Sequence, residues 1–95
     1  VSENKLIREK KKDFEKEQRK LQNKISASER EIERLETEIS ELDKVLTDPE
    51  KYKEAMNNQG IFDNYQKFKH LLKVEMDKWE ALHNELESLN MKFII

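Results

Sequence analysis

The side chains of this chain that could do chemistry are carboxylates, basic groups and two histidines, and their spacing does not predict catalysis. Glutamates alternate with apolar residues at helical period, which we interpret as one solvated helix face: Glu29, Glu31, Glu33, Glu36, Glu38 and Glu41. His70 and His83 lack a second histidine three or four residues away, so we expect both on the exposed surface. The chain has one glycine and hence no glycine-rich phosphate loop. We therefore predict no catalytic residue, no cofactor and no metal site in this chain.

The basic residues gather near the amino terminus. Residues 1–24 contain nine basic and five acidic side chains, a net charge of +4, whereas residues 25–50 contain three and nine, a net charge of −6. Five of the basic side chains share the outward side of a predicted helix: Lys5, Lys12, Lys16, Arg19 and Lys20. They could contact phosphates as a stripe. The alternative is that they are solubilising charges paired with nearby acids at helical spacing.

The element that positions this stripe is a long helix with a seven-residue repeat. Apolar residues recur at spacings of three and four, the signature of a coiled coil, at Ile7, Phe14, Leu21, Ile25, Ile32, Leu35, Ile39, Leu42 and Leu46. Lys11 and Gln18 interrupt this seam, so we expect looser packing near the amino end and the tightest packing near the turn. The predicted helix covers residues 6–46 and is about 60 Å long.

The repeat stops at Asp48-Pro49 and resumes after Gly60. Proline suits the first position of a helix and Asp48 can cap it, which predicts a short helix over residues 49–56. Gly60 can take the left-handed conformation that ends such a helix. The second heptad segment predicts a helix over residues 61–92. The fold class is therefore all-α, a two-helix antiparallel coiled-coil hairpin over residues 6–93 with a short helical turn at its tip.

Folding the chain back at this turn predicts which core residues face each other. The expected pairs are Leu35 with Leu72, Ser28 with Trp79, and Phe14 with Phe93. A serine leaves the volume that an indole opposite it needs. Glu75 is discordant at a core position, and we expect Met76 to share the packing there.

Composition limits the chain to one domain with a small core, since 42% of its 95 residues are charged and 35% are hydrophobic. The absence of cysteine weakly supports a reducing compartment. No apolar run has the length of a membrane span or a signal peptide. We expect a cytoplasmic location and no membrane partner, with residues 1–5 as a disordered lead-in within a longer protein.

The residues around the turn resemble the carboxy-terminal domain of ABC-F type ATP-binding-cassette proteins. The resemblance rests on the heptads of residues 32–42, on Leu46-Thr47-Asp48-Pro49 with Tyr52 after it, and on Trp79-Glu80 in the returning segment. It implies a soluble parent ATPase that acts on ribosomes, with ATP and Mg²⁺ bound by two cassettes that this chain does not contain. It also implies that the hairpin is an accessory arm.

From the resemblance and the basic stripe together, we predict a non-catalytic arm. Its expected partners are nucleic acid, either ribosomal RNA or DNA, and the cassettes of its own protein. One alternative is a structural spacer or a dimerisation coiled coil, in which the chain forms a homodimer and binds no nucleic acid. Another is the tRNA-contacting hairpin of a synthetase.

Overall fold

The chain forms three helices in a computed structural model that describes residues 3–57 and 59–94. They are α1 (Glu3–Thr47), α2 (Pro49–Met56) and α3 (Gln59–Ile94). Within these described ranges no residue is in a strand, so the prediction of an all-α chain is confirmed. Few residues interrupt the helices because the chain has one glycine and one proline.

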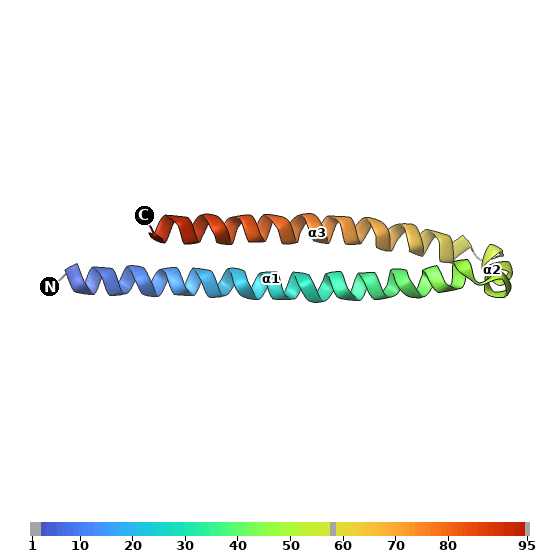
Figure 1. Ribbon diagram of the computed structural model, residues 1–95, viewed down its shortest axis with the longest axis horizontal. Helices are drawn as coiled ribbons and strands as arrows, with labels where there is room; N and C mark the ends of the chain where they lie inside the picture. The colour runs from blue at the N-terminus through green and yellow to red at the C-terminus, as the bar shows by residue number, and fades with distance from the viewer. Residues whose placement is uncertain (1–2, 58, 95) are drawn as a thin grey trace.

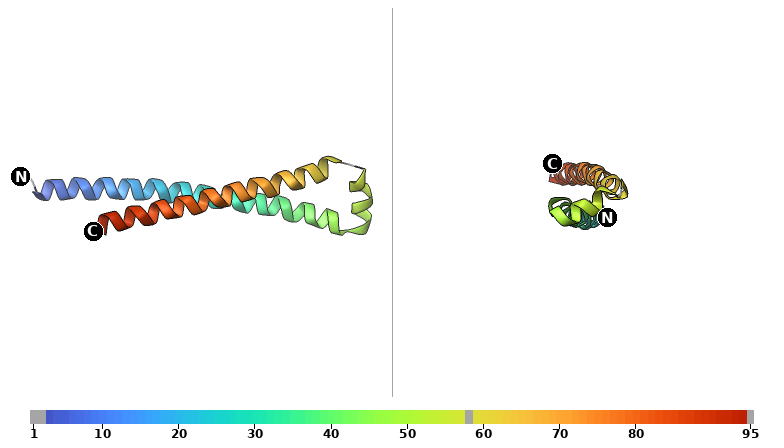
Figure 2. Two further views of the ribbon diagram at one scale, coloured as in Figure 1. Left: turned by 90° about the horizontal axis from the view of Figure 1, so that it is seen from above. Right: turned by 90° about the vertical axis from the view of Figure 1, so that its right-hand side faces the viewer.

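The two long helices lie side by side and form a rod of 75 × 16 × 15 Å (Figure 1). α3 returns along α1 in the opposite direction, so both ends of the chain lie toward one end of the rod and α2 lies at the other (Figures 1 and 2). At the end of the rod that carries the termini, the rings of Phe14 and Phe93 stack with their centroids 4.1 Å apart. The prediction that these two residues meet is confirmed.

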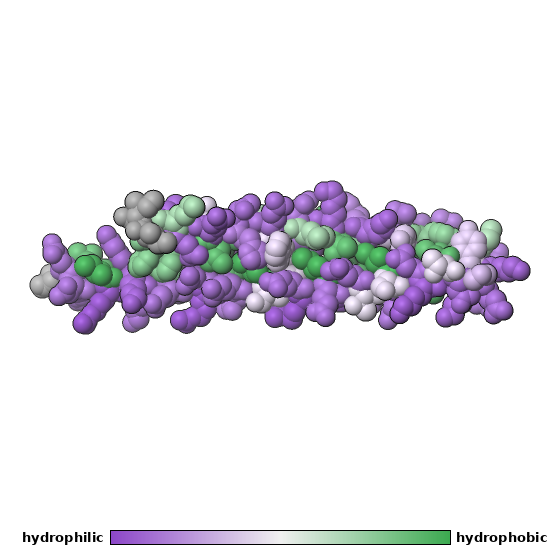
Figure 3. Space-filling model, in the orientation of Figure 1, coloured by the Kyte–Doolittle hydropathy of each residue, from purple (hydrophilic) through white to green (hydrophobic). Residues whose placement is uncertain are grey.

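The core of the rod is a narrow seam between α1 and α3, with the hydrophilic side chains on its outer edges (Figure 3). Its most buried apolar side chains in the long helices are Leu21, Ile25, Leu35 and Leu82. Trp79, Leu86 and Leu89 of α3 pack against the cluster formed by Leu21, Ile25 and Leu82. These residues lie in the middle of the rod, and the heptad spacing explains why they all face the partner helix.

At the closed end, α2 connects the two long helices. Pro49 occupies its first turn, and Asp48 Oδ1 accepts hydrogen bonds from the backbone N–H groups of Glu50 at 3.0 Å and Lys51 at 3.3 Å. These bonds satisfy donors that the start of a helix leaves without partners. On α2, Ala55 is buried.

The prediction for Gly60 is wrong. α2 ends at Met56 and is capped by Asn57, which has φ −89° and ψ 0°, and Gly60 lies in the first turn of α3. No described residue has a positive φ. The N–H of Asn57 instead donates back to the carbonyl of Glu54 at 3.3 Å, and this tighter turn ends the helix without a left-handed residue.

Two further expectations are corrected. Helix α1 already includes Glu3, Asn4 and Lys5, so the disordered lead-in does not extend over them; no helix breaker lies there, and an acid suits the first turn. Residues 1–2 lie outside the described residues. The tightest packing is also not near the turn, because α1 and α3 diverge toward α2 (Figure 2) and Leu42 and Leu46 are half-buried.

Candidate nucleic-acid interface

The five basic residues singled out in the sequence all lie on α1 with exposed side chains: Lys5, Lys12, Lys16, Arg19 and Lys20. Three of them, Lys12, Lys16 and Arg19, line one shallow hollow together with Asp13 and Glu15. Lys5 and Lys20 lie outside this hollow, toward either end of the basic segment. The structure therefore brings together the three residues in the middle of the stripe.

The packing of α1 determines which way these side chains point. Leu21 and Ile25 are buried against α3, and the ring of Phe14 stacks on Phe93. Lys12, Lys16 and Arg19 are exposed although they lie among these core positions in the sequence. Burial of the seam thus holds the basic residues on the solvent side of the same helix.

The basic side chains of the stripe have no acidic partner. The ion pairs found among the described residues are Arg34 with Glu31 at 2.6 Å and Lys73 with Asp77 at 3.3 Å. Both lie outside the first 24 residues. Within residues 3–57 and 59–94, none of the five basic groups takes part in an ion pair, although Asp13, Glu15 and Glu17 are nearby in the sequence.

In the acidic segment, residues 25–50, an arginine by contrast forms an ion pair with a glutamate. The guanidinium of Arg34 donates to both carboxylate oxygens of Glu31, at 3.1 and 2.6 Å. The hydrogen bond from Arg34 lowers the pKa of Glu31, and attraction between the two charges acts in the same direction. A spacing of three residues is therefore enough for an ion pair in that segment. Acids lie at similar spacing from the basic residues of the stripe, so those residues are unpaired because of how their side chains are oriented.

A further polar contact joins the long helices toward the closed end. A side-chain hydrogen bond to Asp43 of α1 is the main cause that raises the pKa of Tyr65 of α3, with burial and the negative charge adding to it. Tyr65 lies in the second heptad segment, and Asp43 is the acid that lies opposite it on α1.

The prediction for one histidine is wrong. His70 is exposed, but His83 is half-buried and its ring lies 4.2 Å from that of Trp79 in an edge-on arrangement. Nε2 of His83 is buried and has no hydrogen-bond partner. The spacing of four residues between Trp79 and His83 places them on one helix face, and that spacing was the available signal.

The predicted packing residues are distributed along the seam. Ser28 and Leu35 are buried, whereas Leu72 and Trp79 are half-buried. The hydroxyl of Ser28 donates to the carbonyl oxygen of Glu75 at 3.5 Å. Direct contact of Ser28 with Trp79 stays a prediction. Met76 lies at the edge of the seam and is 51% exposed, so only part of its side chain can share the packing near Glu75.

The remaining chemistry of the surface is limited. Within residues 3–57 and 59–94, no group of three or more His, Asp or Glu side chains is placed to hold a metal ion. None of the described helices combines the length and the apolar character needed to cross a membrane.

The fold and the surface together define an accessory helical arm. Residues 16–84 match the family described as the ABC transporter C-terminal domain, and the chain belongs to that family. No curated protein and no solved structure matches the chain. The matched segment contains Lys16, Arg19 and Lys20, together with the Asp48-Pro49 turn, whereas Lys5 and Lys12 precede it.

Proposed function

We propose that this chain is the non-catalytic C-terminal arm of a soluble, cytoplasmic ABC-F ATPase and that it contacts ribosomal RNA or DNA through the basic face of α1. The interface consists of Lys5, Lys12, Lys16, Arg19 and Lys20. ATP and Mg²⁺ belong to the cassettes of the parent protein in this proposal. In this proposal the antiparallel coiled-coil hairpin is a stiff rod whose basic end, where both chain ends lie, is next to the rest of the parent protein, while α2 lies at the far end (Figure 1).

The observation that carries the proposal is that five exposed cations on one helix face have no acidic partner. A phosphate that meets such a cation does not have to displace a protein carboxylate. Binding instead releases counterions condensed on the nucleic acid, and that release is the main source of affinity for sequence-independent contacts.

The dimensions of the stripe suit a phosphate backbone. From Lys5 to Lys20 the helix rises by about 22 Å, at roughly 1.5 Å per residue. One strand of a duplex places a phosphate about every 3.4 Å along its axis, so the stripe spans about six phosphates. The described surface has no element that would enter a groove and contact base edges, so we expect binding without sequence preference.

Charge reversal tests the proposal. In a first variant, Lys12, Lys16, Arg19 and Lys20 are changed to Glu. In a matched control, the same number of exposed basic residues near the closed end is reversed: Lys44, Lys51, Lys53 and Lys67. We expect the first variant to lose affinity for duplex RNA and DNA by roughly tenfold or more, and the control to lose much less.

Helix content measured by circular dichroism verifies that both variants remain folded. Equal losses in the two variants would mean that net charge and not the stripe governs binding. Unchanged binding in the first variant would overturn the proposed interface.

The second candidate function is a spacer or dimerisation coiled coil that binds no nucleic acid. The exposure of the apolar residues Leu6 and Ile7 on α1 favours it. Sedimentation that shows a stable dimer, together with no detectable binding of any polyanion, would favour this candidate over the proposed function.

A further inference from the structure

The hollow in the basic stripe contains carboxylates as well as cations. Its lining residues, all with exposed side chains, are Lys12, Asp13, Glu15, Lys16 and Arg19. We call it the mixed hollow. A site that only attracted phosphates would gain nothing from the two acids, because a carboxylate and a phosphate repel each other. The mixture indicates a ligand that carries a hydrogen-bond donor beside its phosphates.

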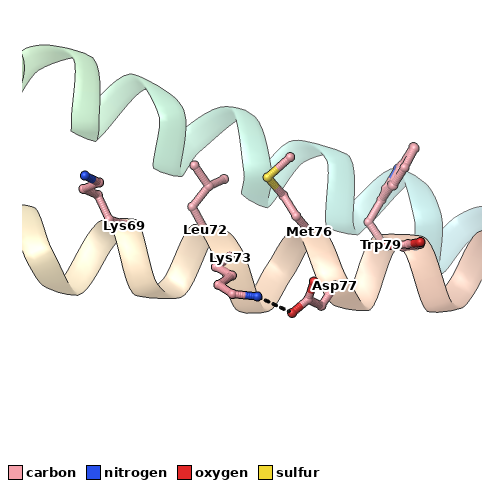
Figure 4. A pocket seen from close by; sticks show the side chains of 7 residues that line it. Lys69, Leu72, Lys73, Met76, Asp77 and Trp79 are labelled. Carbon is pink, nitrogen blue, oxygen red and sulfur yellow. Dashed lines mark hydrogen bonds and ion pairs between the residues drawn. The ribbon is translucent and has the colours of Figure 1, made fainter.

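The two carboxylates of the mixed hollow are available to such a donor. Within residues 3–57 and 59–94, neither Asp13 nor Glu15 forms an ion pair. Glu15 lies four residues before Arg19, a spacing that suits an ion pair on a helix. Lys73 and Asp77 have the same spacing, and there the Nζ and Oδ2 atoms do pair, at 3.3 Å (Figure 4). The carboxylate oxygens of the mixed hollow can therefore accept hydrogen bonds from a ligand.

The carboxylates flank the cations on the surface of α1. Phe14 points toward α3, where it stacks on another ring. On a helix of about 3.6 residues per turn, Lys12 and Lys16 lie on the side opposite Phe14. Asp13 and Glu15 lie on either side of these lysines, each about 80° around the helix from the centre of the stripe. A nucleic acid that follows the cations therefore has an acceptor on each side.

The 2′-hydroxyl group of ribose is a donor that such acceptors can use. It distinguishes RNA from DNA, because deoxyribose lacks it. The minor groove of an A-form RNA duplex is wide and shallow and displays these hydroxyl groups. An α-helix with its side chains is about 10–12 Å across, which suits that groove. The minor groove of B-form DNA is only about 6 Å wide and does not admit a helix.

From these features we infer that the mixed hollow recognises the ribose-phosphate backbone of duplex RNA in preference to DNA, an inference that rests on the proposed function. Lys12, Lys16 and Arg19 contact phosphates. Asp13 and Glu15 accept hydrogen bonds from 2′-hydroxyl groups. On DNA the same carboxylates meet no hydroxyl donor and repel the phosphates. The contacts involve sugar and phosphate, so the preference is for RNA as a class and not for a base sequence.

Three duplexes of one base sequence test this inference: RNA, RNA with fluorine in place of each 2′-hydroxyl group, and DNA. The fluorinated duplex keeps the A form but cannot donate a hydrogen bond from the 2′ position. Binding to the 95-residue chain is measured by fluorescence anisotropy at one fixed salt concentration. We expect the chain to bind RNA roughly tenfold more tightly than either of the other duplexes, because only RNA donates to the carboxylates.

Removal of the acceptors should abolish this preference. A variant with Asp13→Ala and Glu15→Ala should bind RNA and fluorinated RNA with affinities within about twofold of each other. The matched control carries Glu3→Ala and Glu17→Ala, which remove the same charge at exposed sites of α1 outside the mixed hollow. Both variants should bind DNA more tightly than the unmodified chain, because each loses two repulsive charges. Only the control should keep the preference for RNA.

The outcomes separate this inference from the proposed function. Equal affinities of the unmodified chain for RNA and fluorinated RNA would overturn the inference. A preference for RNA that persists without Asp13 and Glu15 would overturn it as well. In both cases, loss of affinity on charge reversal of the stripe would still support the proposed function. Absence of binding to all three duplexes would contradict the proposed function and the inference together.

Discussion

The middle of the rod and its open end differ in what their side chains contact. In the middle, Leu35 and Ser28 are 1% and 2% exposed between the two helices. At the open end, Ile7 continues the same heptad repeat but is 62% exposed, and the basic side chains near it have no acidic partners. The comparison shows that one heptad repeat has two environments. Where α3 covers α1 the repeat is buried and stabilises the hairpin, and at Ile7 the same repeat is exposed.

Truncation of Leu35 should have the largest effect on this contrast. Leu35→Ala removes a fully buried side chain from the seam and should lower the free energy of unfolding by about 2–5 kcal/mol. Ile7→Ala removes an exposed side chain, and we expect a loss within about 0.5 kcal/mol. Urea unfolding followed by circular dichroism measures both. Similar losses for the two variants would show that the middle does not dominate the stability of the hairpin.

Loss of the cap at the closed end should have an intermediate effect. Asp48→Ala removes the acceptor for the N–H groups of Glu50 and Lys51, and we expect a loss of about 1 kcal/mol. Thermal unfolding measures this change. Asp48→Asn retains a side-chain oxygen and is the matched control, with an expected stability close to that of the unmodified chain. Equal destabilisation by both substitutions would contradict a capping role.

The smallest expected effect concerns the ion pair between Arg34 and Glu31. Because Arg34 lowers the pKa of Glu31 in the folded chain, the contribution of the pair is present above the unfolded pKa of Glu31 and is lost as the pH falls through the folded value. The carboxyl carbon of Glu31, followed by NMR during an acid titration, should therefore titrate below its usual range. In Arg34→Ala this pKa should return toward the usual value, and an unshifted titration in the unmodified chain would contradict the pairing.

Much of the helical architecture could be predicted because it depends on local and periodic signals. The heptad spacing identifies the residues that face a partner, and it predicted that Phe14 meets Phe93 near the open end. Membership of the ABC transporter C-terminal domain family, to which the turn at Asp48-Pro49 and Trp79-Glu80 pointed, is confirmed.

Other features depend on the arrangement in space and have weak signals in the sequence. Because α2 lies between the ends of α1 and α3, the long helices diverge there (Figure 2). The tightest packing is therefore in the middle of the rod and not near the turn, as the sequence predicted. The partial burial of His83 follows from its contact with Trp79, which a heptad assignment alone does not reveal. The unpaired state of the basic stripe depends on side-chain geometry, since acids and bases lie at pairing distance in the sequence.

The salt dependence of nucleic-acid binding tests the central claim most directly. If the five residues of the stripe each contact a phosphate, the logarithm of the association constant for duplex DNA should fall linearly with the logarithm of the salt concentration. The expected slope is about −4.5, and changing Lys16 to Gln should reduce its magnitude by about 0.9. Binding that is independent of salt, or a slope that Lys16→Gln leaves unchanged, would contradict the account.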